Sequence, residues 1–118
     1  MQHSQKNRTL SRTRRGRSAL LRSLAISLIR DGQIKTTTAK AKELRPFIEK
    51  IITYSMKDDQ STRKVISSRL GEPNKIILDK LFIEIAPQYN ERAGGYTRII
   101  KLGQITPGKD ESIIEFVV

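Results

Sequence analysis

The sequence predicts an α+β fold of two layers, in which helices pack on one face of a small three-stranded sheet. Between residues 18 and 86, apolar residues recur at the three- and four-residue steps of helices, whereas residues 96–102 and 112–118 have the composition of strands. With a short strand near residue 35, the order is helix, strand, three helices, two strands. A length of 118 residues and a hydrophobic content of 36% suit one domain with a thin core.

Basic residues are concentrated at the start of the chain. The first thirty residues contain eight Lys or Arg and no acid, whereas the other 88 contain 15 basic and 12 acidic residues. Because residues 1–17 have almost no apolar side chains, we expect a basic arm that is disordered when free, followed by one globular domain over residues 18–118. A cleaved organelle presequence has a similar composition and is an alternative interpretation of this segment.

The first helix is predicted to begin at Ser18. Apolar residues from Leu20 to Ile29 follow one side of it, while Arg22 and Arg30 fall on the opposite side. The helix is expected to end at Asp31-Gly32, because glycine readily adopts the left-handed conformation of a helix C-terminus. Its outer face is therefore predicted to be basic.

The second helix is predicted to follow a short strand at residues 33–37 and a cap at Thr37 or Thr38, and to run to about residue 56. Its expected core residues are Ala41, Leu44, Ile48, Ile51, Ile52 and Ser55. Its charged residues are expected largely around the outside, and they are Lys40, Lys42, Glu43, Arg45, Glu49 and Lys50. Pro46 predicts either a kink near Lys42 or a new helix start at the proline itself.

Two more helices and a hairpin complete the predicted fold. A third helix is expected at residues 61–70, and a fourth at 74–86 that stops at Pro87. A polar loop over residues 88–95 precedes the first strand of an antiparallel hairpin. Residues 103–111, which contain Gly and Pro, are predicted to connect its two strands.

The chain does not contain the residue pattern of an enzyme. Its single histidine, His3, lies in the arm without a positioned acid or nucleophile, and the chain has no cysteine. The adjacent Asp58 and Asp59 suit the cap of the third helix better than a metal site. Gly94-Gly95 lacks the preceding strand and following helix of a phosphate loop. We therefore predict no catalytic residue, no metal and no cofactor.

The basic arm instead predicts binding to a polyanion. Its arginines are separated by Ser, Thr, Asn and Gln, which donate hydrogen bonds to phosphate and sugar oxygens, and each guanidinium offers a planar fork that suits phosphate. The chain shows no helix-turn-helix, zinc-finger or basic-zipper pattern, and it lacks the aromatic-rich strands of an RNA recognition motif. An arm that orders on binding, attached to a small rigid body, suits an irregular folded RNA better than a regular duplex.

Six short motifs run in order along the chain. They are the opening Met-x-His, Arg8-Thr9-Leu10-Ser11-Arg12, Ala19-Leu20-Leu21-Arg22-Ser23-Leu24, Ile34-Lys35-Thr36-Thr37, Lys40-Ala41-Lys42-Glu43-Leu44-Arg45 and Gly94-Gly95-Tyr96-Thr97-Arg98-Ile99. As an ordered set that extends from Met1 to the hairpin, they resemble the bacterial-type ribosomal protein seventeen family of the large subunit. The sequence departs from that family at Gln2, where Arg is usual, at Gly16, where His is usual, and over residues 103–111, where an Arg-rich connection is common.

This resemblance implies a two-layer α+β fold and a structural role in the large ribosomal subunit. The protein would bind and stabilise folded rRNA near the peptide exit region, beside neighbouring large-subunit ribosomal proteins. It implies no membrane, no small-molecule substrate and no homo-oligomer. Because the family motifs begin at Met1, the arm is expected to belong to the mature protein rather than to a presequence.

The predicted rRNA-binding residues lie in the arm, on the first two helices and on the strands. They are His3, Lys6, Arg8, Arg12, Arg14, Arg15, Arg17, Arg22, Arg30, Lys35, Lys40, Lys42, Arg45, Tyr96, Arg98 and Lys101. Tyr96 is expected either to stack on a base or to pack across the strands. The other residues would contact phosphate through their charge or hydrogen bonds.

Three other functional classes fit parts of the sequence. A histone-like DNA-binding protein would share the basic arm, but it would oligomerise and bind duplex DNA as tightly as folded rRNA. An RNA-processing enzyme would need a metal site or a general base. A membrane-surface protein would use the first helix but leave the arm unexplained. The sequence is compatible with ribosomes of the bacterial cytoplasm or the plastid stroma, and less so with those of the mitochondrial matrix.

Overall fold

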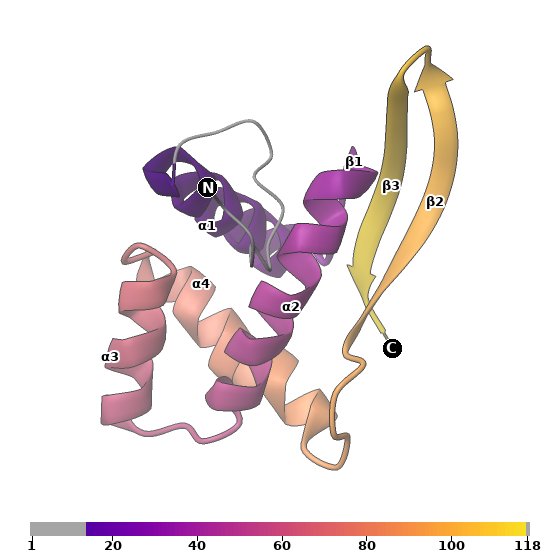
Figure 1. Ribbon diagram of the computed structural model, residues 1–118. Coiled ribbons are helices and arrows are strands. Elements are labelled where there is room, and N and C mark those ends of the chain that lie inside the picture. The colour runs from indigo at the N-terminus through magenta and orange to yellow at the C-terminus, as the bar shows by residue number, and fades with distance from the viewer. Residues whose placement is uncertain (1–13, 118) are drawn as a thin grey trace, which may run out of the picture.

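The computed structural model describes residues 14–117 and confirms the predicted α+β fold. Helices gather on one side of a three-stranded sheet (Figure 1). In chain order the elements are α1 (Arg14–Asp31), β1 (Gln33–Thr37), α2 (Thr38–Ser55), α3 (Gln60–Arg69), α4 (Lys75–Asp79), the π-helix η1 (Lys80–Ile85), the 3-10 helix η2 (Ala86–Tyr89), β2 (Thr97–Thr106) and β3 (Lys109–Phe116). The observed order of helices and strands is the predicted one.

Helix α2 lies at the centre of the molecule and contacts α1, α3, η1, η2 and all three strands. Its apolar face is the one that the sequence predicts, and Leu44, Ile48 and Ile52 are fully buried. These side chains share one core cluster with Leu28 of α1 and Leu81 of η1. Because burial of each such side chain contributes about 1.5–3 kcal/mol, this cluster stabilises the packing of the helices on α2.

The sheet has the strand order β1-β3-β2, and both pairings are antiparallel. In the central strand, Ile114 lies opposite Ile34 on one side and Ile99 on the other, and it is fully buried. Thr38 Oγ1 and Ser112 Oγ lie 2.7 Å apart and share a buried hydrogen bond. This bond attaches the first turn of α2 to β3.

Three of the helix ends lie at residues that the sequence predicts as caps or stops. Gly32 ends α1 with a φ of 81°, a conformation that glycine adopts without strain. Thr37 caps α2, since its Oγ1 accepts a hydrogen bond from the Lys40 N–H at 3.3 Å. Asp59 caps α3 by accepting from the Thr62 N–H at 2.7 Å, and this bond lowers the pKa of the Asp59 carboxyl below its usual value.

Helix α1 begins four residues earlier than predicted. Residues 14–17, which the sequence assigned to the disordered arm, form its first turn. The Arg17 side chain makes an ion pair with Glu43 of α2, which connects this turn to the domain. Glu43 was predicted on the outside of α2 but is only 5% exposed. Helical periodicity alone does not reveal that an acid will be buried beside an arginine from another helix.

Two prolines do not interrupt the helices where the sequence suggested. Helix α2 continues through Pro46, so a new start at this residue is wrong. Burial of Leu44 and Ile48 on the apolar face of α2 offsets the one backbone hydrogen bond that proline removes. The last helical stretch continues through α4, η1 and η2 to Tyr89, beyond the predicted stop at Pro87. Pro87 stands in the first positions of η2, where its missing N–H needs no helical acceptor. The predicted loop over residues 88–95 is correspondingly shorter.

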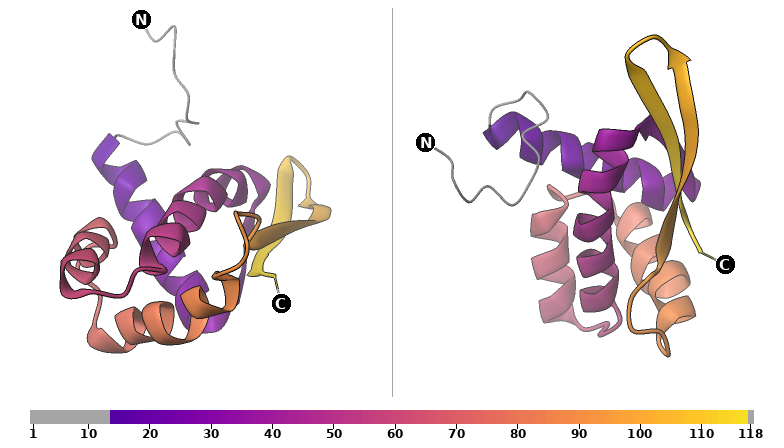
Figure 2. Two further views of the ribbon diagram at one scale, coloured as in Figure 1. Left: turned by 90° about the horizontal axis from the view of Figure 1, so that it is seen from below. Right: turned by 45° about the vertical axis from the view of Figure 1, so that its right-hand side comes forward.

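The hairpin strands are longer than predicted. Most of residues 103–111, expected as a connection, extend β2 and β3, and residues 107–108 alone lie between the two strands. The pairing shifts between Lys101 and Gly103, and Gly103 has a φ of 84°, as a bulge permits. The extended hairpin projects beyond the helices (Figure 2).

The position of the core predicts which isoleucine substitution will be costly. Ile114→Ala should lower the free energy of unfolding by about 2–5 kcal/mol, because it leaves a cavity between the sheet and the helices. The matched control Ile100→Ala, at a site that is 41% exposed, should cost less than about 1 kcal/mol. Urea denaturation of the two variants measures this difference, and equal losses would contradict the placement of the core.

Candidate nucleic-acid interface

Helix α1 carries four exposed arginines along its length. Arg14, Arg15, Arg22 and Arg30 are exposed, and the helix contains no acid before Asp31. The apolar face of α1 is buried in the core and holds the helix in a fixed position. These guanidinium groups are therefore presented to solvent from a rigid element.

A shallow groove of about 410 Å³ lies between α1 and the turn after α3. Arg22, Arg30, Ser23 and Ser27 contribute to its lining, and Gly71 lies in the turn. A Cβ atom at Gly71 would lie 3.3 Å from Cδ of Arg22, so the arginine side chain passes close to the turn. The groove combines cations with hydroxyl groups, which is the combination that contacts phosphate and ribose.

Asp31 partly neutralises Arg30. The Nε and Nη2 atoms of Arg30 donate to the two carboxylate oxygens of Asp31 at 3.0 and 3.1 Å. The hydrogen bond from Arg30 lowers the pKa of the Asp31 carboxyl, so this acid stays ionised at neutral pH. Arg30 and Asp31 together therefore add no net charge to this part of the surface.

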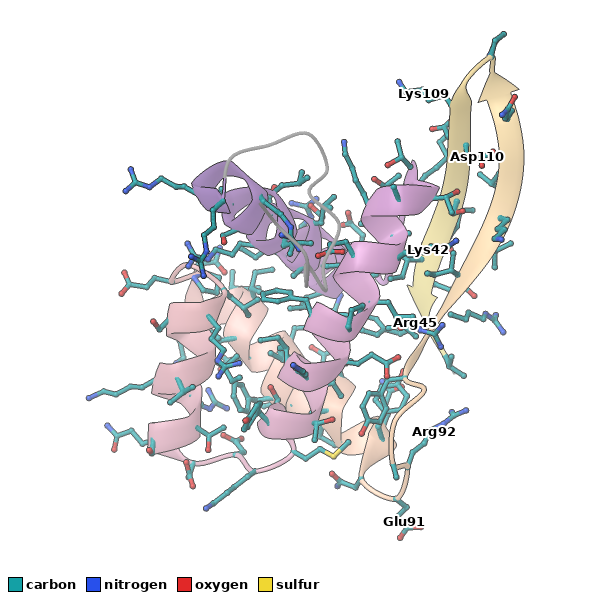
Figure 3. All side chains as sticks on the ribbon, in the orientation of Figure 1. Lys42, Arg45, Glu91, Arg92, Lys109 and Asp110 are labelled. Carbon is teal, nitrogen blue, oxygen red and sulfur yellow. The ribbon has the colours of Figure 1, made fainter. Side chains whose placement is uncertain are left out.

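A second group of exposed cations lies where α2 approaches the hairpin. Lys42 and Arg45 of α2 are exposed on this side of the molecule (Figure 3). A cleft of about 380 Å³ between the first turn of α2 and the hairpin turn is lined by Lys42, Lys109 and Asp110. Lys40 is half-buried in the same turn, which contains no acid, and the helix dipole adds positive potential there.

The three predicted cations of the sheet do not share one face. Lys35, Arg98 and Lys101 are all exposed. Lys101 pairs with Ser112, which points toward α2, so Lys101 lies on the same face as the α2 cations. By strand alternation, Lys35 and Arg98 lie on the opposite face, where Arg98 makes an ion pair with Glu115 at 2.6 Å. The sheet thus contributes one residue to the α2 surface and two to a separate one.

Tyr96 packs inside the molecule. Its side chain is only 2% exposed, and its ring centroid lies 5.1 Å from that of Tyr89. Its hydroxyl donates to the Arg92 carbonyl at 3.1 Å and lies 3.2 Å from Thr53 Oγ1. Its burial leaves no face of the ring open to a base, and it packs on Tyr89 of η2 rather than across the strands, because Tyr96 precedes β2.

Two exposed cations of the hairpin and of the loop before it are absent from the predicted set. Arg92 lies in the loop before β2, and Lys109 begins β3 (Figure 3). Each has an acid beside it, Glu91 or Asp110, so the local net charge is zero and no basic cluster is visible. Lys109 lines the same cleft as Lys42, and this proximity depends on the fold of the hairpin.

Four of the predicted rRNA-binding residues, His3, Lys6, Arg8 and Arg12, lie outside the described residues. Within residues 14–117, no group of three or more potential ligand side chains could hold a metal ion. No helix in that range is long and apolar enough to cross a membrane. The described surface instead offers cations and hydroxyls on rigid helices, which suits a polyphosphate ligand.

Known proteins resemble this chain along nearly its whole length. The family model described as "Ribosomal protein L17" matches residues 20–117. The protein "Large ribosomal subunit protein bL17" of Persephonella marina is 46% identical over 99% of this chain and 95% of its own length. That of Hydrogenobaculum sp. is 47% identical over 99% of both chains, and that of Sulfurimonas denitrificans is 50% identical over 86% of this chain and 85% of its own.

The ion pair between Arg17 and Glu43 generates a prediction about the first turn of α1. Glu43→Ala should lower the free energy of unfolding by about 2–4 kcal/mol, because it leaves a partly buried guanidinium without this carboxylate. Lys42→Ala, a change at the adjacent exposed residue, should alter it by less than about 0.5 kcal/mol. Chemical denaturation measures both values. A negligible loss in the Glu43 variant would show that the ion pair does not hold α1 to α2.

Proposed function

The chain belongs to the ribosomal protein L17 family, and we propose that it binds and stabilises folded rRNA within the large ribosomal subunit. Proteins of this family are structural components of the large subunit and not enzymes. The observation that carries the proposal is the set of exposed arginines on α1, which contains no acid between Arg14 and Arg30. A duplex or folded RNA offers phosphates along such a helix, and each neutralised phosphate releases about one counterion.

The two basic surfaces suit a folded RNA because they project in different directions from one rigid body. Arg22 lies on α1 at the groove beside the α3–α4 turn, whereas Lys42 and Lys101 lie where α2 meets the hairpin. The core between them fixes their separation. A folded RNA presents phosphates in several directions and can contact both surfaces at once, which a straight duplex does less well.

The basic segment before α1 would extend this contact. Residues 1–13 contain Lys6, Arg8 and Arg12 and no acid, and α1 begins directly after them. We propose that these side chains continue the phosphate contacts of the α1 arginines. Charge-assisted hydrogen bonds from these side chains to phosphate would strengthen the binding.

The position that we propose within the ribosome rests on the family resemblance. We propose a position near the peptide exit region, in contact with neighbouring large-subunit proteins, in the ribosome of a bacterial cytoplasm or a plastid. The relatives described above come from bacteria, which favours a ribosome of the bacterial cytoplasm over one of a plastid.

The proposal predicts how salt affects RNA binding. The full chain, titrated with a large-subunit rRNA transcript at increasing salt, should bind it more tightly than duplex DNA of equal length. Arg22→Gln or Lys42→Gln should each reduce the slope of log affinity against log salt by about one, since one phosphate contact is lost. Lys57→Gln is the control, because Lys57 lies beyond α2, 3.6 Å from Asp59, and should leave the slope unchanged.

Duplex DNA provides the test of the histone-like alternative. Equal affinity for DNA and rRNA, together with self-association of the protein, would favour a DNA-compacting role and contradict the proposal. An rRNA affinity whose salt slope is the same in all three variants would show that the α1 and α2 surfaces are not where phosphate binds.

A further inference from the structure

We propose that a cleft between α2, α3 and the loop before β2 binds one unpaired base of the RNA, with Tyr54 as the stacking surface. This inference rests on the proposed function, because it assigns a base-binding subsite to the same RNA partner. The site is separate from the phosphate-binding surfaces of α1 and of the first turn of α2. Of the residues that line the cleft, Tyr96 alone belongs to the predicted set of rRNA-binding residues, and its ring is buried.

The cleft has a volume of about 570 Å³ and is mostly apolar. Its lining comes from three parts of the chain, with Thr53 and Tyr54 near the end of α2, Arg69 at the end of α3 and Gly94 in the loop. Ligand sites commonly combine such an apolar wall with a few polar groups. The volume is ample for a base and its ribose.

Tyr54 is the one exposed aromatic residue of the chain. All six Phe and Tyr residues lie within the described range, and the other five are buried or half-buried, whereas Tyr54 is 53% exposed. The guanidinium carbon of Arg69 lies 5.3 Å from the centre of its ring. This contact holds the ring in place and gives a flat, cationic platform of the kind on which unpaired bases stack.

The opposite wall of the cleft is held rigidly. One carboxylate oxygen of Glu49 accepts from the Gly95 N–H at 3.0 Å, and the other accepts from the Thr97 N–H at 3.1 Å and the Thr97 hydroxyl at 2.8 Å. Three hydrogen bonds thus hold the loop on α2. Gly94 has a φ of 110° and no heavy atom within 4 Å of its missing Cβ, so this wall stays open. A wall fixed before binding lowers the entropy lost when a base enters.

The charges around the cleft favour a nucleotide over an apolar ligand. Lys50 and Arg69 are exposed cations at the lining, positioned to meet the phosphates that flank a bound base. The one acid of the lining, Glu49, is occupied by the loop hydrogen bonds, and Arg45 Nε lies 3.7 Å from it. An aromatic platform flanked by cations is the arrangement that binds single-stranded nucleic acid.

The test compares RNA with a backbone that lacks bases. The full chain is titrated with a single-stranded RNA of about ten nucleotides and with an abasic analogue of the same length. The unmodified protein should bind the RNA at least about fivefold more tightly than the analogue, since base stacking on an aromatic side chain is worth about 1–3 kcal/mol. Tyr54→Leu should remove that preference, and Tyr54→Phe should keep it because the ring remains.

Three controls make the outcome specific. Ile83→Ala changes an apolar side chain that is 60% exposed on η1, away from the cleft, and should keep the preference. The salt slope should be the same for Tyr54→Leu as for the unmodified protein, because stacking involves no phosphate. A thermal unfolding curve of Tyr54→Leu that matches the unmodified protein excludes misfolding as the cause.

The possible failures are distinguishable. If Tyr54→Leu prefers the base-bearing RNA as strongly as the unmodified protein does, the cleft is not a base site. The inference also fails if the unmodified protein shows no preference. In either case the proposed function stands as long as the unmodified protein binds large-subunit rRNA. If the unmodified protein does not bind that rRNA at all, the proposed function itself is wrong.

Discussion

The burial of the apolar face of α2 is the interaction on which the structure depends. Leu44, Ile48 and Ile52 belong to the core cluster, and α2 contacts both the other helices and the three strands. The polar groups on its flanks then fix what surrounds it. Glu43 pairs with α1, Thr38 with β3, and Glu49 with the loop before β2. Each basic or aromatic surface is therefore positioned relative to this one helix.

In this arrangement, different side chains contribute to folding and to the basic surfaces. The acids near the core make structural contacts within the protein, while the exposed sides of α1 and of the first turn of α2 carry mainly cations. Repulsion among those cations opposes folding in the free protein, and the buried contacts of α2 offset it. Phosphates of a bound RNA would remove the repulsion, so binding and stability are coupled.

Much of the fold could be predicted from local sequence signals, but the site could be predicted only in part. Periodicity correctly gave the apolar face of α2, and Gly32 and Asp59 marked helix ends that the structure shows. Glu43 was misjudged because its burial depends on Arg17, which lies 26 residues away. The choice between the two roles of Tyr96 depends on contacts such as that with Thr53, 43 residues away. Such contacts between distant residues leave no periodic signal in the chain.

The dependence on contacts between distant residues also explains the other differences between the predicted and the observed structure. The hairpin was predicted too short because Gly103 and residues 107–108 look like loop residues, although a bulge and a two-residue turn accommodate them within paired strands. The division of Lys35 and Lys101 between two sheet faces follows from the register, which the sequence does not specify. The Tyr54 cleft likewise requires three elements to meet.

The most direct test of the central claim is sedimentation of a cell lysate through density gradients in moderate and high salt. We predict that the full chain travels with the large ribosomal subunit, and that a chain lacking residues 1–13 dissociates at lower salt because phosphate contacts are lost. If the full chain remained free of ribosomes and travelled with chromosomal DNA, the role in rRNA binding would be contradicted.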